Sequence, residues 1–550
     1  MDNIKIRTNM KVGQLDAEND QNFLLNCYFD NGVINILKDT SESEAIILGR
    51  TGAGKTASLM TIYTEIDKGY SKLINLEDVF LRYMDNSSII KFLTDNGVNL
   101  DLFYRYLWRH ILTVEFLKLK YPNLQDRSKF SQFIHELKSL IRSPEEKKAL
   151  QYLEQWSDKY WIETVENIQE VVKNFSNDIT AGLESSLNGN SFSLEGKSGL
   201  TEEQKIDVKH RAQIIVNNLQ ISELSKVIDL MDTHIFNDYK KPYYLLIDRL
   251  DENWVSMDVK YGLIKGLIEE LKPFRKISNV KILVALRVDL YQLTIEKTRS
   301  SGFQEDKLLS LIYKLHWSEA DLKQIIDKRI NYLFKHQYTN REIGFEDLFP
   351  VDKKTENRNA WRYLLTRTFY RPRDILQFVN YCLSQSIDKT VIDWSSIYKA
   401  EKEYSNDRLK SLHEEWFDIY PSLKYTMYLL SNIDELIPKS DFASNVINDD
   451  EILKLYNLFL RYEVDDEISK VVFDLIDKTG TTEVEDVVNE ILSCFYRTGL
   501  IGLSDNLPDS FEWSFKNLAF KSNFDCSHTK WIKVHKMFHE ALHINSSNRI

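Results

Sequence analysis

The segment Gly49–Thr56 constrains this chain most, because it reads Gly-Arg-Thr-Gly-Ala-Gly-Lys-Thr and directly follows the apolar run 45–48. Glycines allow successive backbone N–H groups to close around the β- and γ-phosphates of a nucleotide. A lysine supplies a cation for those phosphates, and the final threonine offers its hydroxyl to Mg²⁺. The apolar run before the loop and the helix-forming residues 57–63 after it predict a strand, a loop and a helix in succession. We therefore expect eight nucleotide-binding residues, with Thr56 also a metal ligand: Gly49, Arg50, Thr51, Gly52, Ala53, Gly54, Lys55 and Thr56.

Composition narrows the class of protein. The 550 residues allow three or four domains, and 43% apolar with 28% charged residues is ordinary for a globular protein. A formal charge of −12 argues against a protein wholly devoted to coating nucleic acid, because that role needs clustered Lys and Arg. The four cysteines are widely spaced and include no Cys-x-x-Cys pair, so the sequence predicts neither a zinc knuckle nor a disulfide framework. Without an apolar signal segment or a long apolar stretch, we expect a cytoplasmic protein with no membrane anchor.

A second strand of a nucleotide-binding sheet is expected at 243–248, where an apolar run ends in Asp248. The interval between the phosphate loop and this strand is far longer than one strand and one helix need. Apolar residues at helical spacing predict that most of the interval is helical. The apolar runs 280–286 and 311–315 predict two more strands of a parallel sheet that is buried on both faces.

This pattern predicts six consecutive segments. They are an N-terminal helical lead-in (1–40), the first part of the ATPase core (41–84), a helical insertion (85–235), the second part of the core (236–317), a helical lid (318–400) and a C-terminal helical, winged-helix-like domain (401–550).

Charged residues follow the expected strands where ligands of open parallel sheets bind. Asp248 ends its strand and is expected to hold Mg²⁺ directly or through water. Asp251 or Glu252, one helical turn later, would orient or deprotonate the attacking water. Arg287 would sense the γ-phosphate, and Arg373, at the start of a helix after a proline, would reach back to the phosphates. Structural roles stay open for all five: helix capping for the acids, and solvation or local pairing for the arginines.

Together these motifs resemble the AAA+ and STAND-like branch of phosphate-loop ATPases. More narrowly, the chain is similar to a bacterial family of STAND-like ATPases with helical insertions that is associated with anti-phage defence. The resemblance implies an α/β core with sheet order 5-1-4-3-2, a lid, a winged helix, and ATP with Mg²⁺ as cofactors. It also implies self-assembly, with an arginine such as Arg299 completing a neighbour's site. Ordinary AAA+ hydrolases place Glu directly after the Mg²⁺-binding Asp, whereas Arg249 stands here. This departure is closer to NACHT-type switches with slow turnover.

Three functions follow as hypotheses. The first is an ATP-hydrolysing switch in bacterial anti-phage defence, which forms a homo-oligomer, responds to a nucleic acid or phage-derived trigger and works through a separate effector protein. The second is an origin-recognition-like protein whose winged helix binds duplex DNA under ATP control. The third is a nucleotide-binding scaffold that does not hydrolyse ATP.

Overall fold

The computed structural model describes residues 4–75, 88–122, 127–141, 143–155, 164–184, 202–217, 221–238, 241–251, 257–298, 306–335, 341–350, 359–478, 481–506, 510–517 and 523–545. The chain divides into two compact units, which are treated separately below. The sheet unit comprises residues 30–49 and 55–315, and the helical unit comprises 1–29, 50–54 and 316–550.

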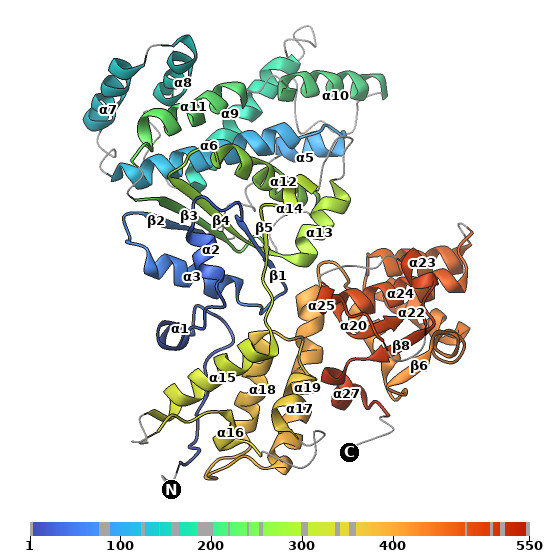
Figure 1. Ribbon diagram of the computed structural model, residues 1–550. Coiled ribbons are helices and arrows are strands. Elements are labelled where there is room, and N and C mark those ends of the chain that lie inside the picture. The colour runs from blue at the N-terminus through green and yellow to red at the C-terminus, as the bar shows by residue number, and fades with distance from the viewer. Residues whose placement is uncertain are drawn as a thin grey trace. The chain divides into compact units, whose positions relative to one another are not determined.

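A parallel five-stranded sheet forms the centre of the sheet unit (Figure 1). Its strands are β1 (Ile46–Gly49), β2 (Ser71–Asn75), β3 (Tyr243–Asp248), β4 (Val280–Arg287) and β5 (Ile312–Lys314). The spatial order β2-β3-β4-β1-β5 is the order 5-1-4-3-2 that the family resemblance implies. Strands β1, β3 and β4 are almost wholly buried, which explains their continuous apolar runs. In the register of the sheet, Gly49 lies beside Arg287, so the phosphate loop leaves the carboxyl edge next to the end of β4.

Helices cover both faces of this sheet (Figure 1). Helix α3 (Lys55–Glu65) packs on β1 and β4 from one face, together with α2 (Val33–Lys38). Helices α12 (Met257–Phe274), α13 (Val288–Lys297) and α6 (Asp101–Lys120) pack on the other face. The remaining helices of the unit are α5 (Ser88–Asp95), α7 (Arg127–Leu140), α8 (Pro144–Gln155), α9 (Thr164–Glu184), α10 (Glu202–Asn217), α11 (Ile221–Leu230), the π-helical η3 (Met231–Ile235) and α14 (Asp306–Leu309). The described residues of the predicted insertion are therefore largely helical, as expected.

The insertion is attached to the core by polar groups buried between α6 and α12. Glu270 is fully buried and accepts hydrogen bonds from Arg109 at 2.5 Å and from Arg105 at 3.0 Å. The Trp108 indole donates to the carbonyl of Leu263 at 2.8 Å. These partners satisfy the buried charges and fix how the two helices pack.

The first part of the helical unit contains one helix of the predicted lead-in and the helices of the predicted lid. They are α1 (Gln21–Cys27), α15 (Glu319–Phe334), α16 (Phe345–Leu348), α17 (Ala360–Leu365), α18 (Pro372–Ser384) and α19 (Trp394–Trp416). Helix α15 begins with a capping box formed by Ser318 and Asp321. Helix α18 begins with Pro372 at its first turn, as its sequence predicts. Helix α19 continues without interruption through residue 400, the position at which the sequence suggested a boundary.

The C-terminal part of the helical unit combines helices with a three-stranded antiparallel sheet of order β6-β8-β7. Its strands are β6 (Leu436–Pro438), β7 (Ile501–Ser504) and β8 (Trp531–Val534). Its helices are α20 (Leu423–Thr426), η6 (Met427–Leu430), α21 (Lys439–Asp441), η7 (Phe442–Val446), α22 (Asp449–Arg461), α23 (Glu467–Asp477), α24 (Val484–Thr498), α25 (Ser514–Asn517), α26 (Asn523–Ser527), η8 (Lys536–Phe538) and α27 (His539–Leu542). Its assignment as a winged helix stays a prediction. Among the described helices, none has the length and apolar character needed to cross a membrane.

Candidate phosphate-binding site

The segment Gly49–Thr56 forms a tight connection between β1 and α3, as predicted. Gly52 and Gly54 have φ values of +75° and +97°, in the left-handed region that other residues rarely adopt. Helix α3 begins at Lys55, so its first N–H groups and the positive end of its dipole lie at the end of the loop. A loop with this backbone can surround an anion at the start of a helix.

Both predicted metal ligands meet at the carboxyl edge of the sheet. The Thr56 hydroxyl forms a hydrogen bond with the Asp248 carboxylate, which also accepts the N–H of Arg249 at 2.9 Å. Burial raises the pKa of Asp248, while these two hydrogen bonds and the charge of Lys55 oppose the shift. Arg249 has a φ of +62°, so the chain turns sharply after β3. A hydroxyl and a buried carboxylate in direct contact are ligands that suit Mg²⁺ beside a phosphate.

Lys55 interacts with charged residues at the ends of two strands, β3 and β4. Its ammonium donates to the carbonyl of Gly49 at 3.1 Å. Burial lowers the pKa of Lys55 to about 8; the charges of Asp251 and Asp248 oppose this shift, whereas that of Arg287 adds to it. The structure therefore brings together four of the residues that the sequence predicted from separate segments.

The structure describes the predicted sensor arginine, Arg287, and one of the two predicted catalytic acids, Asp251. Arg287 forms a bidentate ion pair with Asp289, at 2.6 and 3.1 Å, and lies 3.6 Å from Asp251. The contacts of Arg287 therefore fit the structural alternative, in which this arginine is paired locally. Asp251 lies near Lys55 and is partly exposed, whereas Glu252 falls outside the described residues, as does Arg299. The choice between Asp251 and Glu252 as the base stays a prediction.

Arg373 contacts the phosphate loop within the helical unit. Its backbone N–H donates to the carbonyl of Gly52 at 3.3 Å, and its guanidinium donates to the carbonyl of Leu15 at 3.2 Å. A Cβ atom added to Gly52 would lie 2.7 Å from the Cβ of Arg373, so only glycine fits this approach. Burial lowers the pKa of Arg373. The position of this residue beside the loop agrees with the prediction, but its action on a phosphate stays untested.

Sequence reasoning missed two further side chains that hold the loop. Arg371 donates to the carbonyl of Thr51 and forms a 2.8 Å ion pair with the buried Asp374. The Trp317 indole donates to the carbonyl of Ala53 at 2.7 Å. Arg371 precedes the proline that begins α18, and Trp317 follows shortly after β5. Nothing in the sequence indicates that these side chains donate to loop carbonyls.

The side chain of Arg50 extends from the loop into the C-terminal part of the helical unit. It donates to the carbonyl of Arg497 and to the hydroxyl of Ser514, both at 2.7 Å. A longer contact of 3.4 Å reaches the carbonyl of Thr498. The guanidinium is thus held by protein groups, and the predicted role of Arg50 in nucleotide binding rests on its backbone.

A cavity of about 360 Å³ lies beside Arg373 in the helical unit. Its volume is in the range of small-molecule sites. The side-chain oxygen of Gln377, which lines the cavity, is buried and has no hydrogen-bond partner among the described residues. The other lining residues are Leu15, Asp16, Arg408, Ser411, Glu414 and Glu415.

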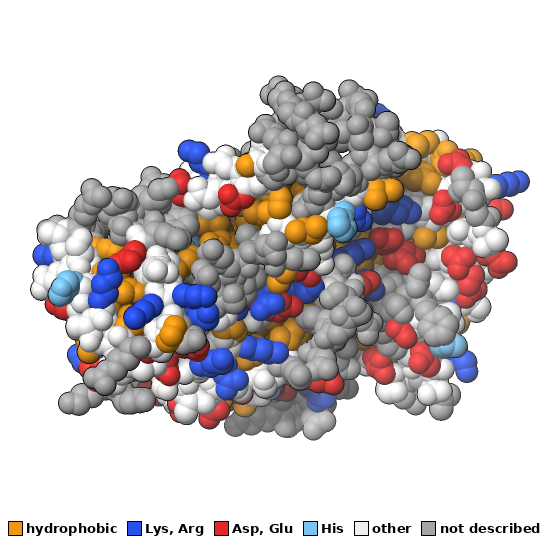
Figure 2. Space-filling model, turned by 90° about the horizontal axis from the view of Figure 1, so that it is seen from above, with side chains coloured by type: hydrophobic (Ala, Val, Ile, Leu, Met, Phe, Trp, Pro, Cys, Tyr) orange, Lys and Arg blue, Asp and Glu red, His pale blue; other side chains and the backbone are white. Residues whose placement is uncertain are grey.

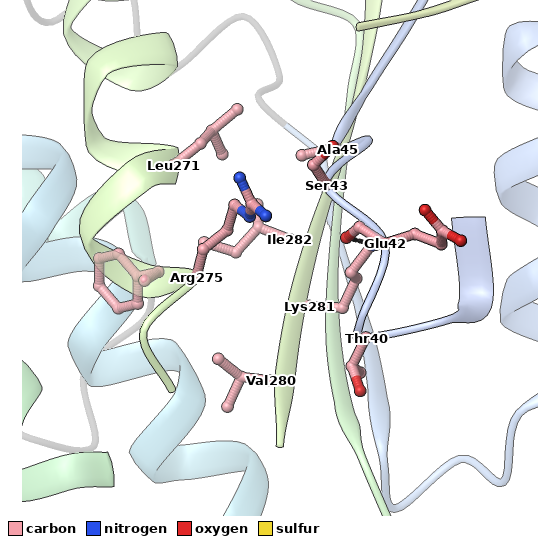
Figure 3. A pocket seen from close by; sticks show the side chains of 10 residues that line it. Thr40, Glu42, Ser43, Ala45, Leu271, Arg275, Val280, Lys281 and Ile282 are labelled. Atoms are coloured by element: carbon pink, nitrogen blue, oxygen red, sulfur yellow. Dashed lines mark hydrogen bonds between the residues drawn. The ribbon is translucent and has the colours of Figure 1, made fainter. Parts of the chain in front are cut away.

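A second cavity, shown in Figure 3, lies at the opposite, amino edge of the large sheet. Its volume of about 20 Å³ is far too small for a nucleotide. Lys281 on its wall donates to the carbonyls of Asp39 and Glu42, at 2.6 and 2.8 Å. Burial lowers the pKa of Lys281 to about 8. These contacts attach the segment before β1 to β4, which is a structural role.

Within the described parts of the chain, no cluster of three or more His, Cys, Asp and Glu side chains is arranged to hold a metal ion. A metal at Thr56 and Asp248 would therefore need further oxygen ligands from phosphate and water, which is how Mg²⁺ is usually held at nucleotide sites.

Comparisons with known proteins identify one part of this architecture. Residues 320–413, which contain α18 and most of α15 and α19, match the family described as the FunZ-associated C-terminal helical domain. Over 564 aligned residues, the chain is 22% identical to the transposon gamma-delta 80.3 kDa protein of Escherichia coli (strain K12). That alignment covers 99% of this chain and 68% of the relative. The allergen Alt a 2 of Alternaria alternata is 30% identical over 116 residues, or 20% of this chain and 60% of the allergen.

No solved structure matches the chain. The names and descriptions of the matched proteins mention neither a phosphate loop nor anti-phage defence. What they show is a helical domain shared with one family and a distant similarity, along nearly the whole chain, to a protein named for a transposon.

Proposed function

We propose that this protein is an ATP-binding switch with a phosphate-loop core, which hydrolyses ATP slowly or only when a partner activates it. The observation that carries the proposal is the hydrogen bond between Thr56 and Asp248 at the carboxyl edge of a parallel sheet of order 5-1-4-3-2. The charge of Lys55 interacts favourably with the same carboxylate. A loop, a lysine, a hydroxyl and an acid in this arrangement serve to hold nucleotide phosphates and their metal.

Each residue has a chemical role in this proposal. The N–H groups of the loop and Lys55 would bind the phosphates, and Thr56 and Asp248 would hold Mg²⁺. The bound Mg²⁺ would neutralise the charge that develops on the transferred phosphoryl group. Asp251 would orient the attacking water, with Glu252 as the alternative base.

Slow turnover follows from the residue after Asp248. In this chain Arg249 occupies the position where fast hydrolases place a glutamate. Its positive φ places it in a turn directly after β3. The paired state of Arg287 also requires rearrangement before it could stabilise a phosphate. We infer that nucleotide state, rather than rapid hydrolysis, is the output, read by a separate effector protein and by other copies of the chain. A role in anti-phage defence stays a proposal from sequence resemblance.

A DNA-binding protein controlled by ATP is the second candidate. The observation that favours it is the similarity of the chain to a protein named for a transposon, together with C-terminal helices that alternate along the chain with the strands of an antiparallel sheet. Figure 2 shows basic and acidic side chains intermixed on the face drawn. A DNA contact would therefore be local, and its affinity would fall steeply with salt. A non-hydrolysing scaffold is the third candidate.

The deciding experiment measures Mg²⁺-dependent ATP binding and steady-state hydrolysis by the full chain, with and without duplex DNA. Lys55→Ala should abolish both, and Asp251→Asn should reduce hydrolysis about 10²-fold or more while sparing binding. Lys68→Ala, which removes an exposed lysine beyond α3, is the matched control and should behave like the natural protein. Binding without Lys55-dependent hydrolysis in either condition would exclude hydrolysis by the isolated chain and leave a partner-triggered switch or a scaffold. No Lys55-dependent binding at all would contradict the proposal.

A further inference from the structure

Arg50 connects the phosphate loop to the C-terminal end of helix α24. Two carbonyl groups of the last turn of this helix, those of Arg497 and Thr498, accept hydrogen bonds from the Arg50 guanidinium. Ser514, which is fully buried, accepts a third through its hydroxyl. Residues from one loop and two distant segments of the C-terminal region thus meet at a single guanidinium.

The last carbonyl groups of any helix lack partners within that helix. Gly499, which directly follows α24, has the left-handed conformation and donates its N–H to the carbonyls of Phe495 and Tyr496. Arg50 donates to the next two carbonyls, those of Arg497 and Thr498. A cation at this position also interacts favourably with the negative end of the helix dipole. Arg50 therefore caps α24, although it is far away in the sequence.

Side chains and backbone groups of the lid segment contact the loop through its carbonyl oxygens. The carbonyls of Thr51, Gly52 and Ala53 all accept hydrogen bonds from the helical unit. Bonds to carbonyl oxygens hold the loop without using the N–H groups that would surround a phosphate. These contacts and those of Arg50 together fix the position of the loop within the helical unit.

We propose that Arg50 makes the end of α24 a reporter of nucleotide occupancy, so that nucleotide binding and capping of α24 strengthen each other. Phosphates would order the loop and fix the backbone of Arg50, which stabilises its hydrogen bonds to α24. By thermodynamic linkage, a partner that pulls on the C-terminal region would weaken nucleotide binding by the same factor. This inference rests on the proposed nucleotide binding and adds a route for its regulation.

The test is hydrogen–deuterium exchange of the full chain with and without Mg²⁺ and ATPγS, read on peptides from residues 484–498. In the natural protein, ATPγS should slow exchange at the end of α24. Ser514→Ala removes one acceptor of Arg50 and also the hydroxyl's own hydrogen bonds to the carbonyls of Tyr496 and Arg497. It should therefore remove most of that protection, and through the loss of the Arg50 bond it should weaken ATPγS binding up to roughly fivefold, as expected for one hydrogen bond. Ser422→Ala is the matched control, because this buried hydroxyl has no partner among the described residues. It should behave like the natural protein.

The outcomes separate the inference from the proposed function. If ATPγS binds through Lys55 but leaves exchange in α24 unchanged, the coupling is wrong and the nucleotide site stands. If Ser422→Ala reduces the protection as much as Ser514→Ala does, the effect belongs to domain stability and the coupling is also wrong. Absence of Lys55-dependent binding overturns the site and the coupling together. Faster exchange at the end of α24 in Arg50→Ala, without any nucleotide, supports the cap itself.

Discussion

Lys55 carries a charge that the folded protein disfavours. Its ordinary pKa of 10.5 falls to about 8, chiefly because it is buried. Below pH 8 the folded and unfolded chains both hold this proton, and burial of the charge costs stability. Between pH 8 and 10.5 the folded chain releases the proton first, so that cost is relieved as the pH rises. Bound nucleotide phosphates would stabilise the charged ammonium of Lys55 and so raise its pKa again.

Proton uptake on ATP binding follows from this shift. At pH 8.5 to 9 we expect binding to protonate Lys55, so the affinity should fall by up to about tenfold for each pH unit above about 8. Calorimetric titration in two buffers of different ionisation enthalpy would measure the uptake directly. Lys55→Arg, which holds its proton throughout this range, should remove the uptake. A binding enthalpy that is independent of the buffer at pH 9 would contradict the assignment.

Gly52 is the residue for which the loop tolerates no side chain. Its φ of +75° is strained for alanine, and an added Cβ would lie 2.7 Å from the side chain of Arg373. Gly52→Ala should therefore cost about 1–3 kcal/mol locally and weaken nucleotide binding, measured by titration with a fluorescent ATP analogue. Gly69→Ala is the control, since nothing lies within 4 Å of its added Cβ and its φ is not positive. Equal affinities for the two variants would show that the loop adapts.

At the scale of elements, the pairing of α6 with α12 joins the insertion to the sheet. The pairing depends on one carboxylate: Glu270 is fully buried between Arg109 and Arg105, whereas its neighbour Glu269 is 26% exposed. A buried charge left without its partner is costly, whereas an exposed pair contributes little.

Removal of the buried Glu270 carboxylate should therefore strongly reduce the stability of the sheet unit. Glu270→Ala leaves Arg109 buried without its partner, and we expect it to lower the free energy of unfolding of the sheet unit by about 3–5 kcal/mol. Glu269→Ala, one residue earlier on the same helix, should cost no more than about 1 kcal/mol. Urea denaturation followed by circular dichroism would compare them. Similar midpoints would indicate that α6 is held by its apolar contacts alone.

The sequence was informative about elements whose signal is local. The apolar runs that form β1, β3 and β4 predicted buried strands, and a proline predicted the start of α18. Strand β2 was not located, because its five residues include only two apolar ones. The contacts of Arg50, Arg371 and Trp317 with other parts of the chain were also missed. They join segments up to several hundred residues apart, and no spacing rule connects such positions.

At the scale of the whole molecule, the cysteines are unevenly distributed. All four, Cys27, Cys382, Cys494 and Cys526, are buried, and all belong to the helical unit. Burial raises the pKa of Cys27, Cys382 and Cys494, so little reactive thiolate forms at neutral pH.

Thiol labelling should consequently report unfolding of the helical unit alone. In native buffer we expect little reaction with a thiol reagent over minutes, and four labelled thiols in denaturant, counted by mass spectrometry. Lys68→Cys places an exposed thiol in the sheet unit and should react at once. Rapid labelling of any of the four natural cysteines without denaturant would show that the helical unit opens locally.

The chain passes from the sheet unit into the helical unit at Arg50 and returns at Lys55. Each unit is therefore assembled from separate stretches of the gene. A deletion, duplication or recombination event with a single breakpoint cannot transfer either unit intact. The sheet unit lies between two stretches of the helical unit along the chain, and the phosphate loop is itself divided between the two units.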